Sequence, residues 1–229
     1  MKIGFHALDL PEGKVKYLDP RFVALEDKFQ PKKSSPYSAE LLKDEFVQCD
    51  VIVIARAALL DLLILDMEKL EARAGRAENE AEKGLIARCL ALLEAETPLC
   101  DGPFDEAERQ ALRGLALASV KPVVVATPPL DASRAIALAL GKAGIVFFFT
   151  AAKSEVHAWP VAAGSDAITC AGKIHTDLAR GFIRADVVAF DDFRTVHGMQ
   201  EARTKGLVKV VERDHVICDG DIIEIKFSV

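Results

Sequence analysis

A glycine followed by a lysine, Gly13-Lys14, is the first place in the chain where residue types could do chemistry. The pair follows a short apolar stretch, Met1 to Phe5, which predicts a strand. A strand that leads into G-x-x-x-x-G-K-[ST] forms the loop whose backbone amides cradle phosphates and whose hydroxyl holds Mg²⁺. That spacing requires a glycine at position 8 and a hydroxyl at position 15, where the chain has Leu8 and Val15. We therefore interpret Gly13 and Lys14 as the remnant of a nucleotide-binding loop, because valine cannot ligate Mg²⁺ and leucine disfavours positive φ.

A second group of polar residues lies in the last third of the chain, where a predicted helix gives way to a strand. Cations at such a junction can make charge-assisted hydrogen bonds to phosphates or carboxylates. We expect a partner-binding surface formed by Lys173, His175, Arg180 and Arg184. The alternative is structural: Thr176 or Asp177 caps the following turn, and the cations are solvated.

The cysteines and histidines do not predict a metal centre or a thiol enzyme. Five cysteines stand at scattered spacings without a C-x-x-C pair, and the five histidines lie far apart. Cys170 and His175 lack an identifiable third group that would orient them for nucleophilic catalysis. We expect no metal, no cofactor and reduced thiols in the cytoplasm.

Composition and charge exclude several classes of protein. Half of the 229 residues are apolar (51%), but no uninterrupted apolar run is long enough for a membrane span, and the first residues do not resemble a signal peptide. The formal net charge is −6. From Val146 onward, ten lysines and arginines face twelve acidic residues, and the preceding part has nineteen against twenty-three. Neither part has the basic character that binding to duplex DNA requires.

Apolar runs and turn signals indicate an α/β protein. Residues 2–6, 51–56 and 122–126 read as buried strands of a small sheet of about three strands. Helices are predicted for residues 105–118, after Gly102-Pro103, and for residues 131–143, with Asp131 as N-cap and Gly144 as the stop.

A helical segment at about residues 61–95 has a heptad-like apolar stripe whose phase shifts near its middle. Gly75, Asn79 and Gly84 cluster at the shift. We interpret the segment as two antiparallel helices with a turn near residues 75–80, and one uninterrupted helix is the alternative.

The C-terminal sequence resembles a known family. It reads IVFFFTAAKSEVHAWPVAAG from Ile145, then KIHTDLARGFIRADVVAFDDF from Lys173, and ends in a DGD run at Asp219. These stretches resemble the C-terminal part of YchF, the Obg-like P-loop ATPases of translation. The resemblance implies a TGS-type, ubiquitin-like β-grasp domain at residues 145–229. It also implies a degenerate, GTPase-like α/β body at residues 1–144 that carries a truncated helical hairpin.

The N-terminal part keeps this resemblance only in pieces. Residues 17–33 resemble a "DPR" segment of the family, and a short polar helix is expected between Pro36 and the strand at residue 51. KPVVVATPPLD, from Lys121, resembles the strand that reads the nucleotide base, but Thr127-Pro128-Pro129 stand where the family has an asparagine. Two prolines supply no donor to a purine edge.

The resemblance with these departures implies a non-catalytic interaction or regulatory protein that has lost nucleotide hydrolysis. Its implied partner is a protein or ribonucleoprotein assembly such as the ribosome. Two alternatives remain: an NTP-binding protein or NTPase with an unorthodox phosphate loop at Gly13 and Lys14, and a small-ligand sensor, because TGS domains also occur in nucleotide-signalling enzymes.

Overall fold

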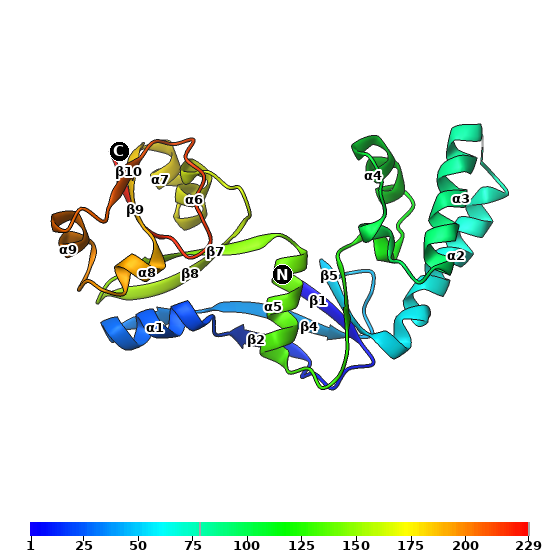
Figure 1. Cartoon of the computed structure of the whole chain (residues 1–229), viewed down its shortest axis with the longest axis horizontal. Helices are drawn as coiled ribbons and strands as arrows, with labels where there is room; N and C mark the ends of the chain where they lie inside the picture. The colour runs from blue at the N-terminus through cyan, green and yellow to red at the C-terminus, as the bar shows by residue number, and fades with distance from the viewer. Residues whose placement is uncertain (78, 229) are drawn as a thin grey trace. The chain divides into compact units, whose positions relative to one another are not determined.

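The structure is a computed structural model that describes residues 1–77 and 79–228. The chain forms two compact units (Figure 1). One unit consists of Met1–Val15 and Ala39–Ala143. The other consists of Lys16–Ser38 and the chain from Gly144 onward.

The first unit contains most of a five-stranded sheet with the strand order β2-β4-β1-β5-β6, of which the end of β2 and the start of β4 fall within the residue ranges of the second unit. Its strands are β1 (Lys2–His6), β2 (Gly13–Tyr17), β4 (Tyr37–Lys43), β5 (Val51–Ala55) and β6 (Val123–Ala126). Strand β1 pairs in parallel with β4 and β5, and β5 pairs in parallel with β6. All five residues of β5 are buried, as a central parallel strand requires. The three predicted strands are confirmed.

Strand β4 corrects the expectation of a short polar helix between Pro36 and residue 51. Its Ala39 and Leu41 are buried while Glu40 is exposed, which is the alternation of a half-buried strand. Leu41 lies opposite Ile3 of β1. The polar residues that suggested a helix occupy the outward positions of this strand.

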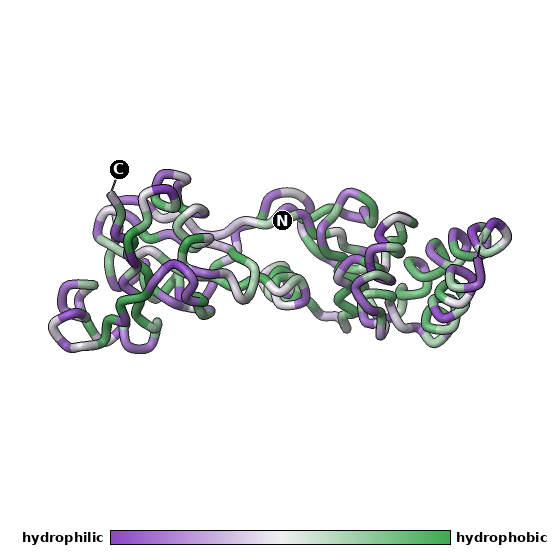
Figure 2. The backbone as a smooth tube through the Cα atoms, turned by 90° about the horizontal axis from the view of Figure 1, so that it is seen from above, coloured by the Kyte–Doolittle hydropathy of each residue, from purple (hydrophilic) through white to green (hydrophobic). Residues whose placement is uncertain are grey.

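The helical hairpin consists of α2 (Leu59–Ala74) and α3 (Glu80–Glu94). Leu63 and Leu70 of α2 share one core with Ile86, Cys89 and Leu93 of α3. Around both helices, hydrophobic and hydrophilic residues alternate turn by turn (Figure 2). Two helices, and not one, are therefore confirmed for residues 61–95. The expected turn includes position 78, which lies outside the described residues.

Two further helices of this unit begin at predicted acidic caps. Helix α4 (Glu106–Arg113) starts with a capping box between Asp105 and Glu108, and α5 (Ala132–Lys142) starts at Asp131, whose carboxylate accepts the Arg134 amide at 2.8 Å. Helix α4 ends five residues earlier than expected. The chain there forms a 3₁₀ turn, η3 (Ala118–Val120), which follows two others, η1 (Arg56–Ala58) and η2 (Leu99–Asp101).

The second unit contains a six-stranded sheet in the order β10-β9-β11-β7-β8-β3. Its elements from Ile145 onward are β7 (Ile145–Ala151), β8 (Glu155–Ala162), α6 (Ala167–Ile174), α7 (Thr176–Arg180), β9 (Phe182–Val188), α8 (Phe190–Phe193), α9 (Met199–Thr204), β10 (Lys209–Val211) and β11 (Ile222–Phe227). Strands β7 and β8 form an antiparallel hairpin, and the last strand, β11, lies parallel to the first, β7. A hairpin, a helix and a last strand that returns to the centre define the expected β-grasp arrangement.

The N-terminal segment contributes to this unit through α1 (Pro20–Phe29) and β3 (Lys33–Ser35). Strand β3 pairs in parallel with β8 as the sixth strand, and α1 buries Phe22, Leu25 and Phe29. The structure therefore differs from the prediction of a continuous body at residues 1–144 and a separate domain at residues 145–229. Residues 16–38 group with the chain from Gly144 onward, because their apolar side chains and strand edge pack there.

Candidate functional site

The carboxyl ends of the strands in the first unit are the place to look for a ligand site. In open parallel sheets, ligands bind in the crevice at the carboxyl ends of two neighbouring strands whose connections run to opposite sides of the sheet. Strand β1 has β4 on one side and β5 on the other, so this point lies at the end of β1. The residue there is His6.

His6 is held between two carboxylates. Its Nδ1 lies 2.6 Å from Asp44 Oδ1, just after β4, and its Nε2 lies 3.0 Å from Asp61 Oδ2, in the first turn of α2. The Phe46 ring packs edge-on against the imidazole. Burial works against the charged ring, but the hydrogen bonds to both carboxylates outweigh it and raise the pKa of His6. The end of β1 is thus occupied by an imidazole and two carboxylates.

The predicted nucleotide-loop remnant, Gly13 and Lys14, lies at the start of a strand. From Ala7, which has a positive φ of 53°, the chain runs to Gly13 and enters strand β2. A phosphate loop instead leads into a helix, whose N-terminal amides bind the anion. Lys14 is exposed on β2, and Gly13, with φ of 99°, opens that strand. Gly13 and Lys14 are therefore strand residues in this structure.

The segment after β6 is the place where the sequence predicted an altered base-reading loop. It contains Thr127 and a cis peptide bond between Pro128 and Pro129. Neither proline has a backbone N–H to donate. Within the described part of the chain, no group of three or more His, Cys, Asp or Glu side chains is placed to hold a metal ion.

Three of the four predicted partner residues lie together on the helices of the second unit. Lys173 is exposed in the last turn of α6, and His175 and Arg180 are exposed at the two ends of α7. His175 is itself the cap: its Nδ1 accepts the Asp177 amide at 3.2 Å. Arg180 forms an ion pair with Asp177 at 2.7 Å. The capping role that we considered for Thr176 or Asp177 thus belongs to His175.

Arg184 is separated from the other three. Helix α6 packs on one face of the sheet, in a core that includes Ala185, Val187 and Ile223. Residues alternate between the faces of a strand, so Arg184, with its partner Lys226 across the ladder, points to the opposite face. The predicted surface is therefore divided between two faces of the second unit.

The thiol of Cys170 is excluded as a nucleophile by its surroundings. The residue is fully buried in the core beneath α6, and burial raises the pKa of the thiol to about 12.

A network that sequence reasoning missed links the two ends of the second unit. The Arg21 guanidinium bonds the Asp19 carboxylate at 3.0 and 2.8 Å and Asp219 at 3.0 Å. Asp219 also accepts the Phe147 amide at 2.9 Å. Gly220 lies against Arg21, where a Cβ would come within 2.9 Å of the guanidinium. The "DPR" segment and the closing DGD run, each visible as a motif, are thus parts of one contact.

Comparisons with known proteins find similarity to YchF proteins, in sequence for the C-terminal part and in fold for the whole chain. Residues 145–228 match the YchF-GTPase_C family, described as a protein of unknown function (DUF933). The ribosome-binding ATPase YchF of Bacillus subtilis is 43% identical over 86 residues, which is 38% of this chain and 24% of that protein. Obg-like ATPase 1 of Danio rerio is 44% identical over 82 residues, or 36% of this chain and 21% of that protein.

A solved structure extends the likeness to the whole chain. The Schizosaccharomyces pombe YchF GTPase matches with a TM-score of 0.77 over 99% of this chain and 97% of that chain, at 17% sequence identity, which shows a shared fold. The resemblance to the YchF and Obg-like ATPases is confirmed: residues 145–228 match the family in sequence, and the whole chain has the YchF fold. The sequence matches span about a quarter of the length of the curated relatives.

Proposed function

We propose that this chain is a non-catalytic interaction or regulatory protein, derived from a translation-associated NTPase, in which nucleotide hydrolysis has been lost. The observation that carries the proposal is the end of strand β1, where His6 is clamped by Asp44 and Asp61. The exposed Asp9 and Glu12 add further negative charge to the loop that follows.

This arrangement is unfavourable for a nucleotide phosphate. Phosphates bind where backbone amides and cations converge, and carboxylates at the same place repel them. The two carboxylates more than offset the single positive charge of a protonated His6, so the cluster is negative overall. Lys14, the one cation of the predicted loop remnant, extends from a strand, and Leu10 in the same loop is buried and anchors it to the core.

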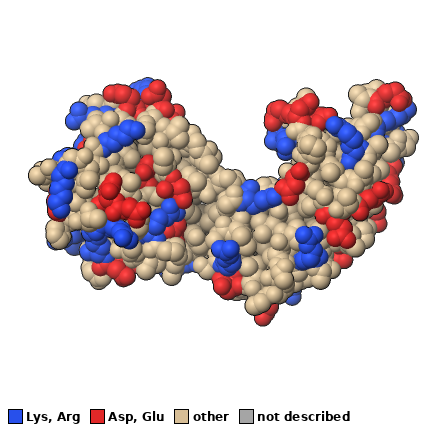
Figure 3. Space-filling model, in the orientation of Figure 1, with Lys and Arg blue, Asp and Glu red and all other residues tan. Residues whose placement is uncertain are grey.

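The proposed partner is a protein or ribonucleoprotein assembly of the translation apparatus, met in the cytoplasm. Support comes from the curated relatives, whose name is ribosome-binding ATPase. Acidic and basic side chains are interspersed on the visible face (Figure 3), which does not suit duplex DNA. No helix among the described residues is long and apolar enough to cross a membrane.

Calorimetry with ATP and GTP, each with Mg²⁺, tests the loss of nucleotide binding. We expect dissociation constants weaker than about 1 mM, because only about 4 kcal/mol of binding free energy would remain without the amide cradle and the metal hydroxyl. Micromolar binding with turnover that Lys14→Ala abolishes would show instead that the chain is an NTPase.

Co-sedimentation with ribosomes of the source organism tests the partner surface. We propose Lys173, His175, Arg180 and Arg184 as contact residues, and their division between two faces allows separate tests. Arg180→Gln and Arg184→Gln should each lower recovery about threefold to tenfold and weaken its salt dependence, because each loses one charge-assisted contact.

The matched control is Arg194→Gln, an exposed arginine outside the proposed surface. Circular dichroism establishes that each variant is folded. Equal recovery of both variants and the control would place the contact elsewhere on the molecule.

A further inference from the structure

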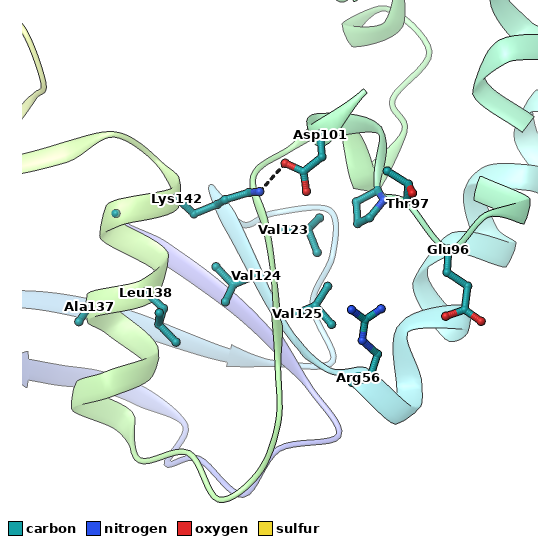
Figure 4. Close-up of a pocket in the computed structure, with 12 residues that line it drawn as sticks. Arg56, Glu96, Thr97, Asp101, Val123, Val124, Val125, Ala137, Leu138 and Lys142 are labelled. Carbon is teal, nitrogen blue, oxygen red and sulfur yellow. Dashed lines mark hydrogen bonds and ion pairs between the residues drawn. The ribbon is translucent and has the colours of Figure 1, made fainter. Parts of the chain in front are cut away.

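A groove lies along the outer edge of strand β6, within the first unit (Figure 4). Its volume is about 630 Å³. One wall is helix α5, with Ala137 and Leu138, and the other is the segment from Glu96 to Asp101. The floor is formed by Val123, Val124 and Val125 of β6 itself.

The backbone of β6 is poised to bond a further strand in this groove. Strand β6 stands last in the sheet order, with β5 on its inner side. The Ile52 amide bonds the Pro122 carbonyl at 2.9 Å, so Val124 and Ala126 also point to β5, whereas Val123 and Val125 point outward. The Val123 amide lies near the Cys100 thiol, where it partly offsets the burial that raises the pKa of that thiol. The Val125 amide and carbonyl, which face away from β5, have no hydrogen bond to any described residue.

The charges of the groove differ between its two ends. Lys142 forms an ion pair with Asp101 beside Val123, and each neutralises the other. Arg56 lies beside Val125, is exposed, and has no hydrogen bond or ion pair with any described residue. Because Arg56 directly follows β5, it marks the carboxyl end of the sheet.

We propose that this groove binds an extended peptide with apolar side chains at alternate positions, which adds to β6 as a parallel strand and places its carboxylate on Arg56. Strand addition supplies affinity through main-chain hydrogen bonds, and the apolar walls accept alternate side chains. In a parallel strand the peptide's carboxyl end falls at the carboxyl end of β6, where the unpaired cation lies. The exposed Glu96 favours a singly charged carboxylate over a phosphate dianion. This inference does not depend on the proposed function.

The probe is the acetylated peptide Lys-Thr-Val-Thr-Val with a free C-terminal carboxylate, titrated into the full ¹⁵N-labelled chain. We expect saturable shifts of the Val123, Val125 and Arg56 amides. The same peptide with a C-terminal amide should bind about tenfold more weakly, because it loses a charge-assisted contact. Shifts that map elsewhere, or no saturation by 5 mM peptide, would overturn the proposal.

Two variants test separately the main-chain hydrogen bonds of β6 and the positive charge of Arg56. Arg56→Gln should reduce the affinity of the carboxylate peptide to that of the amide peptide and leave the amide peptide unchanged. Val125→Pro removes the outward amide but no ladder bond to β5, so it should abolish binding of both peptides. Arg76→Gln, an exposed arginine in the turn after α2, is the matched control.

Two outcomes contradict the proposal directly. If the two peptides bind equally to the wild-type chain, Arg56 does not read a carboxylate. If the Val123 and Val125 amides shift with protein concentration alone, and sedimentation velocity shows a dimer, the edge is occupied by a second copy of this chain.

Discussion

His6 shows how three ordinary surface residues form a fixed charge cluster. The histidine ends β1, Asp44 follows β4, and Asp61 stands in the first turn of α2, so one imidazole links three elements. Both ring nitrogens face carboxylate oxygens, and only the protonated ring donates from both. The cluster is therefore strongest when His6 is charged.

This linkage predicts a pH dependence of stability. The pKa of His6 is raised in the folded protein above its ordinary value of 6.5, so the stabilisation is complete below pH 6.5 and is lost as the pH rises through the raised value. His6→Gln should lower the free energy of unfolding at pH 5.5 by less than about 1 kcal/mol, because exposed ion pairs contribute little. At pH 9 the two proteins should differ less.

Urea unfolding of the wild type and His6→Gln at both pH values measures this effect. Lys205→Gln is a useful control, because its pairing with Glu201 on α9 leaves the His6 cluster untouched. A stability difference that is the same at pH 5.5 and pH 9 would mean that the charge of His6 plays no part.

The candidate site was only partly predictable from the sequence. Leu8 and Val15 occupy fixed places in a local motif, so their effect on a phosphate loop follows from spacing alone. His6, Asp44 and Asp61 belong to no motif and meet only because β1, β4 and α2 converge. The separation of Arg184 from Lys173, His175 and Arg180 was not predictable for a related reason, since nearness in sequence does not say which face of a sheet a residue occupies.

At the scale of elements, one buried carboxylate joins the helical hairpin to the turn that precedes β6. Asp66 of α2 is fully buried, and its two oxygens accept the amides of Ala118 and Ser119, both at 2.7 Å. These are the first amides of the 3₁₀ turn η3, and no carbonyl within the turn can accept their hydrogen bonds. Asp66 thus substitutes for a cap on an element distant in sequence.

Replacing Asp66 should be costly. In Asp66→Asn one carboxylate oxygen becomes a donor that faces a backbone donor, and Asp66→Ala leaves both amides without a partner. We expect each to lower the free energy of unfolding by about 3 kcal/mol, as for buried groups that lose charge-assisted bonds. Exposed Asp61→Asn, measured in the same urea series, should cost less than about 1 kcal/mol. Comparable losses in all three variants would contradict the role of burial.

Elements with a strong local signal were predictable, and elements defined by their neighbours were not. Buried β5 is a continuous apolar run, and α5 begins at an aspartate cap, so both were found. Strand β4, with the sequence YSAELLK, carries residues that favour a helix, and its pairing with β1 overrides that preference. Strand β3 has three residues and no apolar pattern at all.

At the scale of the whole molecule, the chain crosses between its two units three times, after Val15, after Ser38 and after Ala143. A fragment that begins at Gly144 therefore lacks α1 and β3. It would expose the face on which Phe29 stacks against Phe193 and would leave the edge of β8 unpaired.

This organisation predicts how fragments behave. Residues 144–228 alone should melt at least 10 °C below the same residues fused through a short glycine-serine linker to residues 16–38, because the fragment loses a buried helix face. Differential scanning calorimetry of the two proteins measures this. Equal transitions would mean that the β-grasp core is complete without the N-terminal segment.

Residues 16–38 are synthesised well before the strands on which they pack. Roughly a hundred residues must be made between Ser38 and Gly144. At about 5–20 residues per second, that takes on the order of 5–20 seconds before the strands that cover this segment even leave the ribosome. Throughout that interval Phe22, Leu25 and Phe29 have no native surface to bury against, so the nascent chain exposes three apolar side chains that a chaperone can bind.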